Sequence, residues 1–255
     1  MNRLLRNISN RFDISVSNFE GGNLRNAIPR EAFSTIVFNK SSIEPLKNWI
    51  DSFYSTLVDE FGELEKDLKI SLSEVDLPSF VMNKESQERL LNALTCCPHG
   101  AIAWSKDMDD LVETSTNLAS VKTKDTIIVG TSQRSSVDSA KKDIANRLNA
   151  VFNLGQAEVS HSTGYPGWKP DLNSEILRIT KKSYKKLFNK NPQVRAIHAG
   201  LECGLFLEKY PDLDMISFGP TIKGAHSPDE RLEIKSVKKF WDLLLEVLKN
   251  IPESN

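Results

Sequence analysis

The chain has few cysteines, almost no net charge and no long apolar stretch. Its three cysteines include the adjacent pair Cys96 and Cys97, which gives no even disulfide framework and favours a reducing cytoplasm. A formal net charge of -1 provides no general attraction to nucleic acid or to an anionic membrane. No apolar run approaches the roughly 20 residues that span a bilayer, and the N-terminus lacks the apolar centre of a secretory signal. The composition therefore predicts a cytoplasmic globular protein with no nucleic-acid or membrane partner.

Hydrophobic patterning in the first two thirds of the chain alternates between strand and helix periods. Short β-branched or alternating stretches predict strands at 34–38, 68–72 and 156–160, and a hairpin at 112–121 and 126–131. Apolar residues at helical spacing predict helices at 43–61, 85–95 and 140–151. This order is typical of an α+β domain, a sheet with helices on one face, which we expect to cover residues 1–163.

The glycine- and proline-rich segment Gly164–Pro170 predicts a domain boundary. Beyond it we expect a helix, a strand at 194–198, a short helix, a strand at 215–218, and a last helix at 237–248 with Ser236 as its N-cap. About 90 residues with two short apolar strands make a poor independent domain, because such strands need neighbouring strands and helices on both faces. Residues 164–255 are therefore predicted to be the C-terminal part of a larger α/β domain.

One imidazole, His226, lies in the loop between the second of these strands and the last helix. Loops beyond the carboxyl ends of strands in α/β sheets commonly bind ligands. Asp229 and Glu230 follow closely, and a carboxylate can orient a metal-binding histidine by accepting its second N–H. From these residues alone, His226 is either a metal ligand or an ordinary histidine of a surface loop.

A second group of reactive side chains, His198, Glu202 and Cys203, follows the first of the two strands. Cys203 with His198 could form a thiol–imidazole pair, as in a cysteine hydrolase. A cysteine at the start of an apolar helix usually serves packing, which is the favoured interpretation. The pair Cys96 and Cys97 with His99 is too closely spaced for a tetrahedral metal site and is interpreted as a helix end.

Two further side chains are suited to binding a peptide terminus. Arg134 lies between a predicted strand and a predicted helix, and a guanidinium there can hold a carboxylate in a bidentate manner. Asn26 lies in the turn-rich segment Gly21–Arg30, where an amide can bind a peptide group or a carboxylate. An ordinary exposed arginine and an ordinary surface turn are the alternatives.

Several ordered blocks of this sequence resemble the aminoacyl-histidine dipeptidases, also called cytosol non-specific or β-alanyl-histidine dipeptidases. The blocks are Gly21–Arg30, Val112–Leu118, Tyr165–Trp168, His198–Gly204 and Ile216–Glu230, and they cover nearly the whole chain in the family's order. That family belongs to the co-catalytic zinc peptidases. The resemblance implies a catalytic α/β domain with an inserted lid domain, two zinc ions (other divalent metals being possible), and cleavage of unblocked dipeptides such as Xaa-His.

Single positions acquire expected roles from this resemblance. His226 resembles the family's C-terminal zinc ligand, Asn26 and Arg134 resemble the lid residues that contact the substrate, and Glu202 falls near the substrate. The lid corresponds to residues 1–163 and the C-terminal segment of the catalytic domain to residues 164–255. A homodimer is a further expectation.

The family's remaining zinc ligands and its general base have no counterpart in these 255 residues. A zinc hydrolase needs several protein ligands and a base that activates its water. The resemblance therefore predicts a C-terminal portion of the dipeptidase that is inactive by itself. The alternatives are a non-catalytic module that binds peptides or self-associates through the lid, and a thiol hydrolase that uses Cys203.

Overall fold

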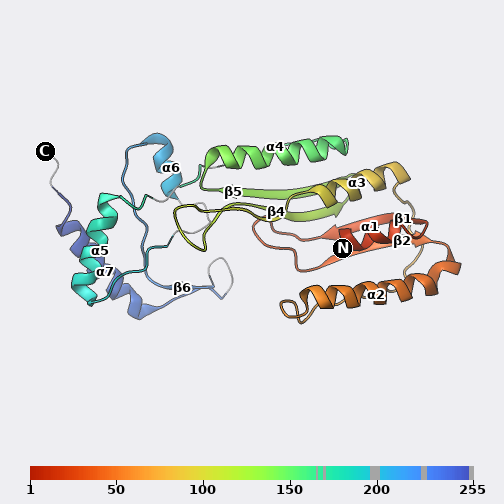
Figure 1. The fold of residues 1–255 in the computed structure, drawn as a ribbon, viewed down its shortest axis with the longest axis horizontal. Coiled ribbons are helices and arrows are strands. Elements are labelled where there is room, and N and C mark those ends of the chain that lie inside the picture. Colours follow the sequence, from red (N-terminus) through yellow and green to blue (C-terminus); the bar gives the residue numbers. More distant parts are fainter. Residues whose placement is uncertain (165, 169–170, 196–201, 225–228, 253–255) are drawn as a thin grey trace. The chain divides into compact units, whose positions relative to one another are not determined.

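The computed structural model describes residues 1–252 except 165, 169–170, 196–201 and 225–228 (Figure 1). Contacts divide the chain into two compact units. The first unit comprises residues 1–104, 112–135 and 139–163, and the second comprises residues 105–111, 136–138 and 164–255. No helix in the described part of the chain is both long and apolar enough to cross a membrane.

A five-stranded antiparallel sheet forms the first unit, with β4 (Val112–Thr123) at its centre. The hairpin partner β5 (Ile127–Ser135) pairs along the whole of β4, from Thr123 opposite Ile127 to Thr114 opposite Ser135. The other edge of β4 has two partners in succession, β3 (Gly100–Trp104) and then β1 (Ile14–Gly21). An outer strand, β2 (Ala32–Phe38), completes the order by pairing with β1.

Four helices cover one face of this sheet: α1 (Asn2–Ser9), α2 (Ile43–Phe61), α3 (Lys84–Cys96) and α4 (Asp138–Leu154). Leu5, Leu46 and Leu91, from α1, α2 and α3, are almost fully buried in one cluster with side chains of β1 and β4. A second cluster joins α3 to α4. Leu118 of β4 and Val129 of β5 pack against both clusters, so the four helices share a single face. The predicted sheet with helices on one face is confirmed.

The predicted helices and the hairpin are confirmed in the first unit, but two predicted strands are wrong. Residues 68–72 and 156–160 belong to no strand. The Leu68 carbonyl accepts a hydrogen bond from the Tyr54 hydroxyl at 3.1 Å, and Ile70 packs on the core, so the alternation reflects contacts of a loop. The 156–160 stretch begins with Gln156 in a left-handed conformation, which ends α4 and turns the chain back so that Val159 packs on the helices.

The sequence analysis missed α1, β1 and β3. In β1 the register shifts between Val16 and Asn18, so the buried side chains Ile14, Val16 and Phe19 do not follow a strict two-residue period. The register of β3 against β4 shifts twice within five residues. Bulges of this kind hide a strand from any search for regular alternation.

The second unit contains three helices, α5 (Glu175–Phe188), α6 (Glu202–Lys209) and α7 (Ile234–Lys249), and the two-residue strands β6 (Ile222–Lys223) and β7 (Arg231–Leu232). Residues 215–218 belong to no strand, so that prediction is wrong: no strand among the described residues lies beside them. Of the predicted strand at 194–198, residues 194 and 195 are not in a strand, and the rest lies outside the described residues.

Ser236 is not the N-cap of the last helix, because α7 begins two residues earlier and Glu233 occupies that position. The Ser236 hydroxyl donates to the Glu233 carbonyl at 2.6 Å and accepts from the Thr221 backbone N–H at 2.8 Å. Its role is to hold the preceding loop against the first turn of α7.

A carboxylate from the loop before β6 holds the N-terminus of α5. Asp214 accepts a hydrogen bond from the Ile176 N–H at 2.9 Å, next to the N-cap Ser174, whose hydroxyl accepts from the Leu177 N–H at 3.0 Å. Partial desolvation opposes ionisation of Asp214. Hydrogen bonds from Ser174 and from the backbone N–H groups of residues 175, 176 and 215 outweigh it, so the pKa of Asp214 lies below its ordinary value.

Replacing this carboxylate should loosen the attachment of α5. Asp214→Asn is expected to lower the free energy of unfolding by about 1 kcal/mol at neutral pH, since it removes an anion at a helix N-terminus. A depressed pKa stabilises the fold at pH values above the unfolded-state pKa, and this contribution is lost as the pH falls through the folded-state pKa. Denaturant unfolding should therefore show a constant difference from the unmodified chain near neutral pH that shrinks below about pH 4. Asp212→Asn is the matched control, and an equal effect there would contradict the assignment.

Candidate functional site

The turn that carries Asn26 is fixed to the middle of β4. The side-chain amide of Asn117 donates to two carbonyls of the turn, those of Arg25 at 3.2 Å and Ala27 at 2.8 Å. Gly22 enters the turn with a φ of +63°, and a Cβ atom there would lie 2.0 Å from the Ala119 carbonyl oxygen. Only glycine allows this close approach. Asn26 itself is exposed at the tip of the turn.

Arg134 lies in β5, half-buried and directly opposite Ser115 of β4. Ser115 and Asn117 are two residues apart on β4, so their side chains share a face of the sheet, and Arg134 shares that face with its partner Ser115. Leu118 points to the opposite, helix-covered face. The structure therefore brings Arg134 and the Asn26 turn to the helix-free face. The β4 residues that they contact, Ser115 and Asn117, are about 7 Å apart along the strand.

Polar pairs on the helix-covered face fix the backbone beneath Arg134. The hydroxyls of Thr114 and Ser135 lie 2.8 Å apart, and Gln133 donates from Nε2 to the Thr116 hydroxyl at 3.3 Å. Thr114 and Thr116 are each only 2% exposed. These bonds hold the β4–β5 register at the end where Arg134 lies, so the guanidinium starts from a rigid strand rather than from a loop.

Asn117 is a residue of the candidate site that the sequence reasoning missed. Its amide oxygen is buried and has no hydrogen-bond partner, while its amide nitrogen serves two acceptors. The block Val112–Leu118 contained Asn117 and was used for the resemblance, but its amide was not assigned a role. The signal that could have found it is a polar amide at a central position of a strand rich in threonine.

The other predicted site residues lie in the second unit. Glu202 is the first residue of α6, and its side chain is not among the described ones. His226 and His198 lie outside the described residues. Within the described residues, no three side chains of histidine, cysteine, aspartate or glutamate gather as a metal-binding group.

The cysteines provide no reactive pair at the end of α3. That helix ends at Cys96, as the sequence indicated, and Cys97 turns into the core with 8% of its surface exposed. Burial raises the pKa of the Cys97 thiol to about 11. His99 is occupied elsewhere: its Nδ1 accepts the backbone N–H of Leu118 at 3.0 Å, beyond the point where β3 leaves β4.

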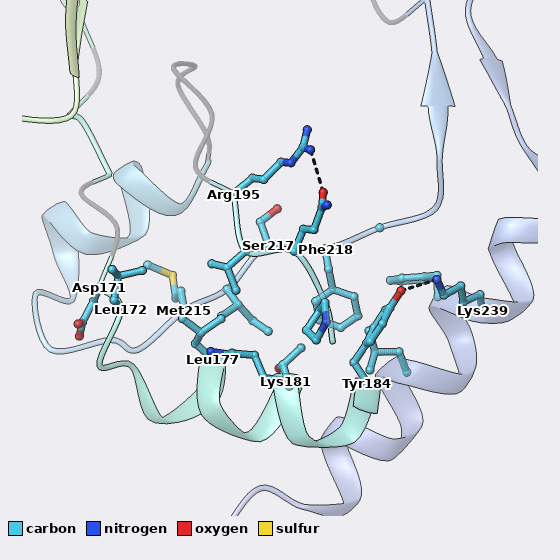
Figure 2. A pocket seen from close by; sticks show the side chains of 18 of the residues that line it. Asp171, Leu172, Leu177, Lys181, Tyr184, Arg195, Met215, Ser217, Phe218 and Lys239 are labelled. Carbon is cyan, nitrogen blue, oxygen red and sulfur yellow. Dashed lines mark hydrogen bonds between the residues drawn. The ribbon is translucent and has the colours of Figure 1, made fainter. Parts of the chain in front are cut away.

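A cavity of about 530 Å³ lies in the second unit between α5, α7 and the segments around residues 193 and 217 (Figure 2). Leu177, Phe218 and Phe240 contribute to its apolar wall. Arg195 donates to Gln193 at 2.8 Å and Lys239 donates to the Tyr184 hydroxyl at 2.6 Å.

Comparison with known proteins identifies relatives of this chain. The model of peptidase family M20/M25/M40 matches residues 17–250. The chain belongs to this peptidase family. The cytosol non-specific dipeptidase of Escherichia coli (strain K12) is 39% identical over 251 residues, which are 98% of this chain and 52% of that protein. The structure of an aminoacylhistidine dipeptidase from Vibrio alginolyticus matches with a TM-score of 0.90 and 39% identity, over 100% of this chain and 53% of that one.

These matches confirm the resemblance seen in the sequence. The matched family is one of peptidases, enzymes that hydrolyse peptide bonds. Dipeptidases of the family are generally metal-dependent. The chain spans about half the length of both relatives.

The two hydrogen bonds from the Asn117 amide lead to a prediction about the Asn26 turn. Asn117→Ala removes both hydrogen bonds to the turn, which together contribute about 1–3 kcal/mol to its order. Backbone amides of residues 23–28 should then exchange hydrogen several-fold faster, as measured by hydrogen–deuterium exchange with mass spectrometry. Asn153→Ala is the control, because that exposed amide bonds only to Asn149 on the same helix. Unchanged hydrogen exchange in the turn would show that these two bonds do not order it.

The raised pKa of Cys97 leads to a second prediction. In a Cys96→Ser variant, iodoacetamide at about pH 8 should leave Cys97 unmodified while the chain is folded, because the thiol is buried and almost wholly protonated there. Modification should appear after unfolding in guanidinium, and peptide mass spectrometry locates it. Fast labelling of Cys97 in the folded chain would contradict the burial.

Proposed function

We propose that this chain supplies the substrate-holding half of a zinc-dependent dipeptidase that cleaves unblocked dipeptides such as Xaa-His. The proposal rests on one observation: Arg134 and the Asn26 turn lie on the same, helix-free face of the sheet. Relatives at 39% identity are a cytosol non-specific dipeptidase and an aminoacylhistidine dipeptidase, which supports the same substrate class.

In this proposal Arg134 binds the carboxylate of the dipeptide through two parallel N–H···O bonds. Asn26 binds the substrate backbone, since an amide offers both a donor and an acceptor to a peptide group. The rigid β4–β5 ladder and the two hydrogen bonds from Asn117 give these two groups a fixed separation. Glu202 is proposed, from the resemblance, to lie near the substrate. A fixed separation selects ligands of one length, which favours dipeptides over longer peptides.

His226 is proposed as one zinc ligand. When bound, zinc would polarise the scissile carbonyl and lower the pKa of a bound water. One histidine does not make a zinc site, and the described residues add no cluster of ligands to it. The remaining ligands and the general base are therefore expected in the half of the relatives' length that this chain does not cover, and the chain by itself should not hydrolyse dipeptides.

The remaining proposals follow from the same family. Residues 1–163 would form the lid domain and residues 164–255 the C-terminal segment of the catalytic domain. The protein would act in the cytoplasm and form a homodimer. The alternative is a non-catalytic module in which the first unit, compact without the second, binds peptides or self-associates.

Hydrolysis of an Xaa-His dipeptide with added zinc tests the proposal. The chain alone should be inactive, and the chain joined at its N-terminus to the uncovered half of the Escherichia coli dipeptidase should be active. In that joined protein, Arg134→Lys should raise KM about tenfold or more with a smaller change in kcat, because a lysine cannot form the bidentate bond. Arg147→Lys, in an exposed ion pair on α4, is the control.

Three results would count against the proposal. Hydrolysis by the chain alone would show that its own residues suffice. Binding of dipeptides by the chain, with no hydrolysis by the joined protein, would favour the non-catalytic module. An equal response of Arg134→Lys and Arg147→Lys would remove the role of Arg134.

A further inference from the structure

The turn that carries Asn26 also exposes the guanidinium of the residue before it. The Ala27 N–H donates to the Leu24 carbonyl at 3.2 Å, which closes a four-residue turn with Arg25 and Asn26 at its two central positions. Both side chains are exposed at this corner. A ligand that binds to Asn26 therefore lies next to the residue that carries the guanidinium of Arg25.

The backbone of Arg25 is fixed although its side chain is exposed. The Asn117 amide donates to the Arg25 carbonyl at 3.2 Å and to the Ala27 carbonyl at 2.8 Å. Gly22 fits the start of the turn against Ala119 of β4, where a Cβ atom would have no room. A guanidinium on a fixed backbone loses less conformational freedom when it binds a ligand than one on a mobile loop. The turn is therefore preorganised for binding.

Arg25 has no counter-ion among the described residues, where no hydrogen bond or ion pair of its guanidinium occurs. Residues 21–30 contain two arginines and no acidic residue. The carboxylates on either side of this segment are those of Glu20, which accepts the Thr123 N–H at 2.8 Å, and of exposed Glu31. Neither is bonded to Arg25 in the described structure, so no bonded carboxylate neutralises its charge.

Arginines that stabilise the fold of this chain bond to its own carboxylates. Arg3 donates to both oxygens of Glu60 at 2.6 and 2.7 Å and joins α1 to α2. Arg178 donates to both oxygens of Glu175 at 2.8 and 2.6 Å within α5. Arg25 has the same pair of parallel donors but no carboxylate among the described residues to receive them. It is therefore suited to a carboxylate of a ligand.

Arg134 and the Asn26 turn lie at adjacent positions on the helix-free face. Ser115, the β4 partner of Arg134, and Asn117, which holds the turn, are about 7 Å apart along the strand. In the proposed function Arg134 binds the C-terminal carboxylate of the dipeptide. The side chain of the C-terminal residue leaves the carbon atom that bears this carboxylate. An acidic side chain there therefore brings a second carboxylate a few ångströms from the first.

We propose that Arg25 is a specificity-determining residue that binds the side-chain carboxylate of dipeptides ending in aspartate or glutamate. Such a substrate has one carboxylate for each of the two arginines, Arg25 and Arg134. The inference rests on the proposed function, which supplies the dipeptide and its orientation. A C-terminal lysine or arginine would bring a cation to Arg25 and is disfavoured, and a neutral residue is cleaved without this contact.

The test compares two dipeptides that differ in this one charge, Ala-Glu and Ala-Gln. It uses the protein formed by joining the chain at its N-terminus to the uncovered half of the Escherichia coli dipeptidase, with zinc added. At low salt, kcat/KM for Ala-Glu should exceed that for Ala-Gln about fivefold or more, because only the glutamate side chain bonds to Arg25 as an anion. The ratio should fall as sodium chloride is raised to about 0.5 M.

Substitutions of Arg25 should change this ratio and keep the turn, because Asn117 bonds to the backbone carbonyl and not to the side chain. Arg25→Gln should bring the ratio close to one, and Arg25→Glu should make Ala-Lys a better substrate than Ala-Glu. Arg30→Gln removes the same charge from an exposed position of the same segment and should leave the ratio unchanged. Circular dichroism should show the same fold for all three variants.

Three results would overturn the proposal. The first is a ratio near one in the unmodified joined protein. The second is an equal loss in Arg25→Gln and Arg30→Gln, which would indicate a general positive potential instead of a contact. The third is a loss in Arg25→Gln that appears with Glu-Ala instead of Ala-Glu, which would place the N-terminal side chain at Arg25.

Binding to the 255-residue chain by itself separates this inference from the proposed function. In EDTA, millimolar Ala-Glu should shift the NMR signal of the Arg25 Nε–H group more than Ala-Gln does, and loss of the signal in Arg25→Gln identifies it. Such a shift, with no hydrolysis by the joined protein, would reject the dipeptidase and support the Arg25 site. Hydrolysis of Ala-Gln with a ratio near one would do the reverse, and neither shift nor hydrolysis would reject both.

Discussion

The backbone of β4 is hydrogen-bonded along both edges, and the organisation of the first unit depends on it. One edge pairs with β5 for its full length, and the other pairs first with β3 and then with β1. The side chains of Thr123 and Glu20 extend the short β1–β4 joint: Thr123 bonds to the Phe19 backbone at 2.9 Å, and its own N–H donates to the Glu20 carboxylate at 2.8 Å. A slip of one residue in β4 would exchange its two faces and move Asn117 to the helices.

This register also determines what the helix-free face can bind. Side chains that alternate along β4 serve opposite purposes: Thr114 and Thr116 are buried in hydrogen-bonded pairs, while Ser115 and Asn117 face Arg134 and the Asn26 turn. The turn is held at its carbonyls, and the Asn26 side chain is exposed. The second unit is less well packed than the first. Among its described residues few side chains are fully buried, and many apolar side chains are exposed.

Much of the fold could be predicted from the sequence, because long helices and the hairpin carry strong local patterns. The helix at 43–61 and the strands on either side of the turn at Lys124 are examples. The errors have local causes too. Bulges interrupt the side-chain alternation of β1 and β3, so these strands were missed. The loop at 68–72 has the alternation of a strand because Ile70 packs on the core and the Leu68 carbonyl is hydrogen-bonded. Residues 215–218 have the apolar pattern of a strand without a described neighbouring strand to pair with.

The sequence by itself determined the family and the identity of Asn26 and Arg134 as candidates, since both rest on which residues occur in which order. It did not determine that Arg134 and the turn that carries Asn26 lie on one face of the sheet, or that Asn117 holds this turn. Those facts depend on pairings between residues about 20 to 90 positions apart in the chain, such as Ser115 with Arg134 and Asn117 with Ala27. Only tertiary structure decides such pairings, because the burial of a common core selects the strand register and local preference does not.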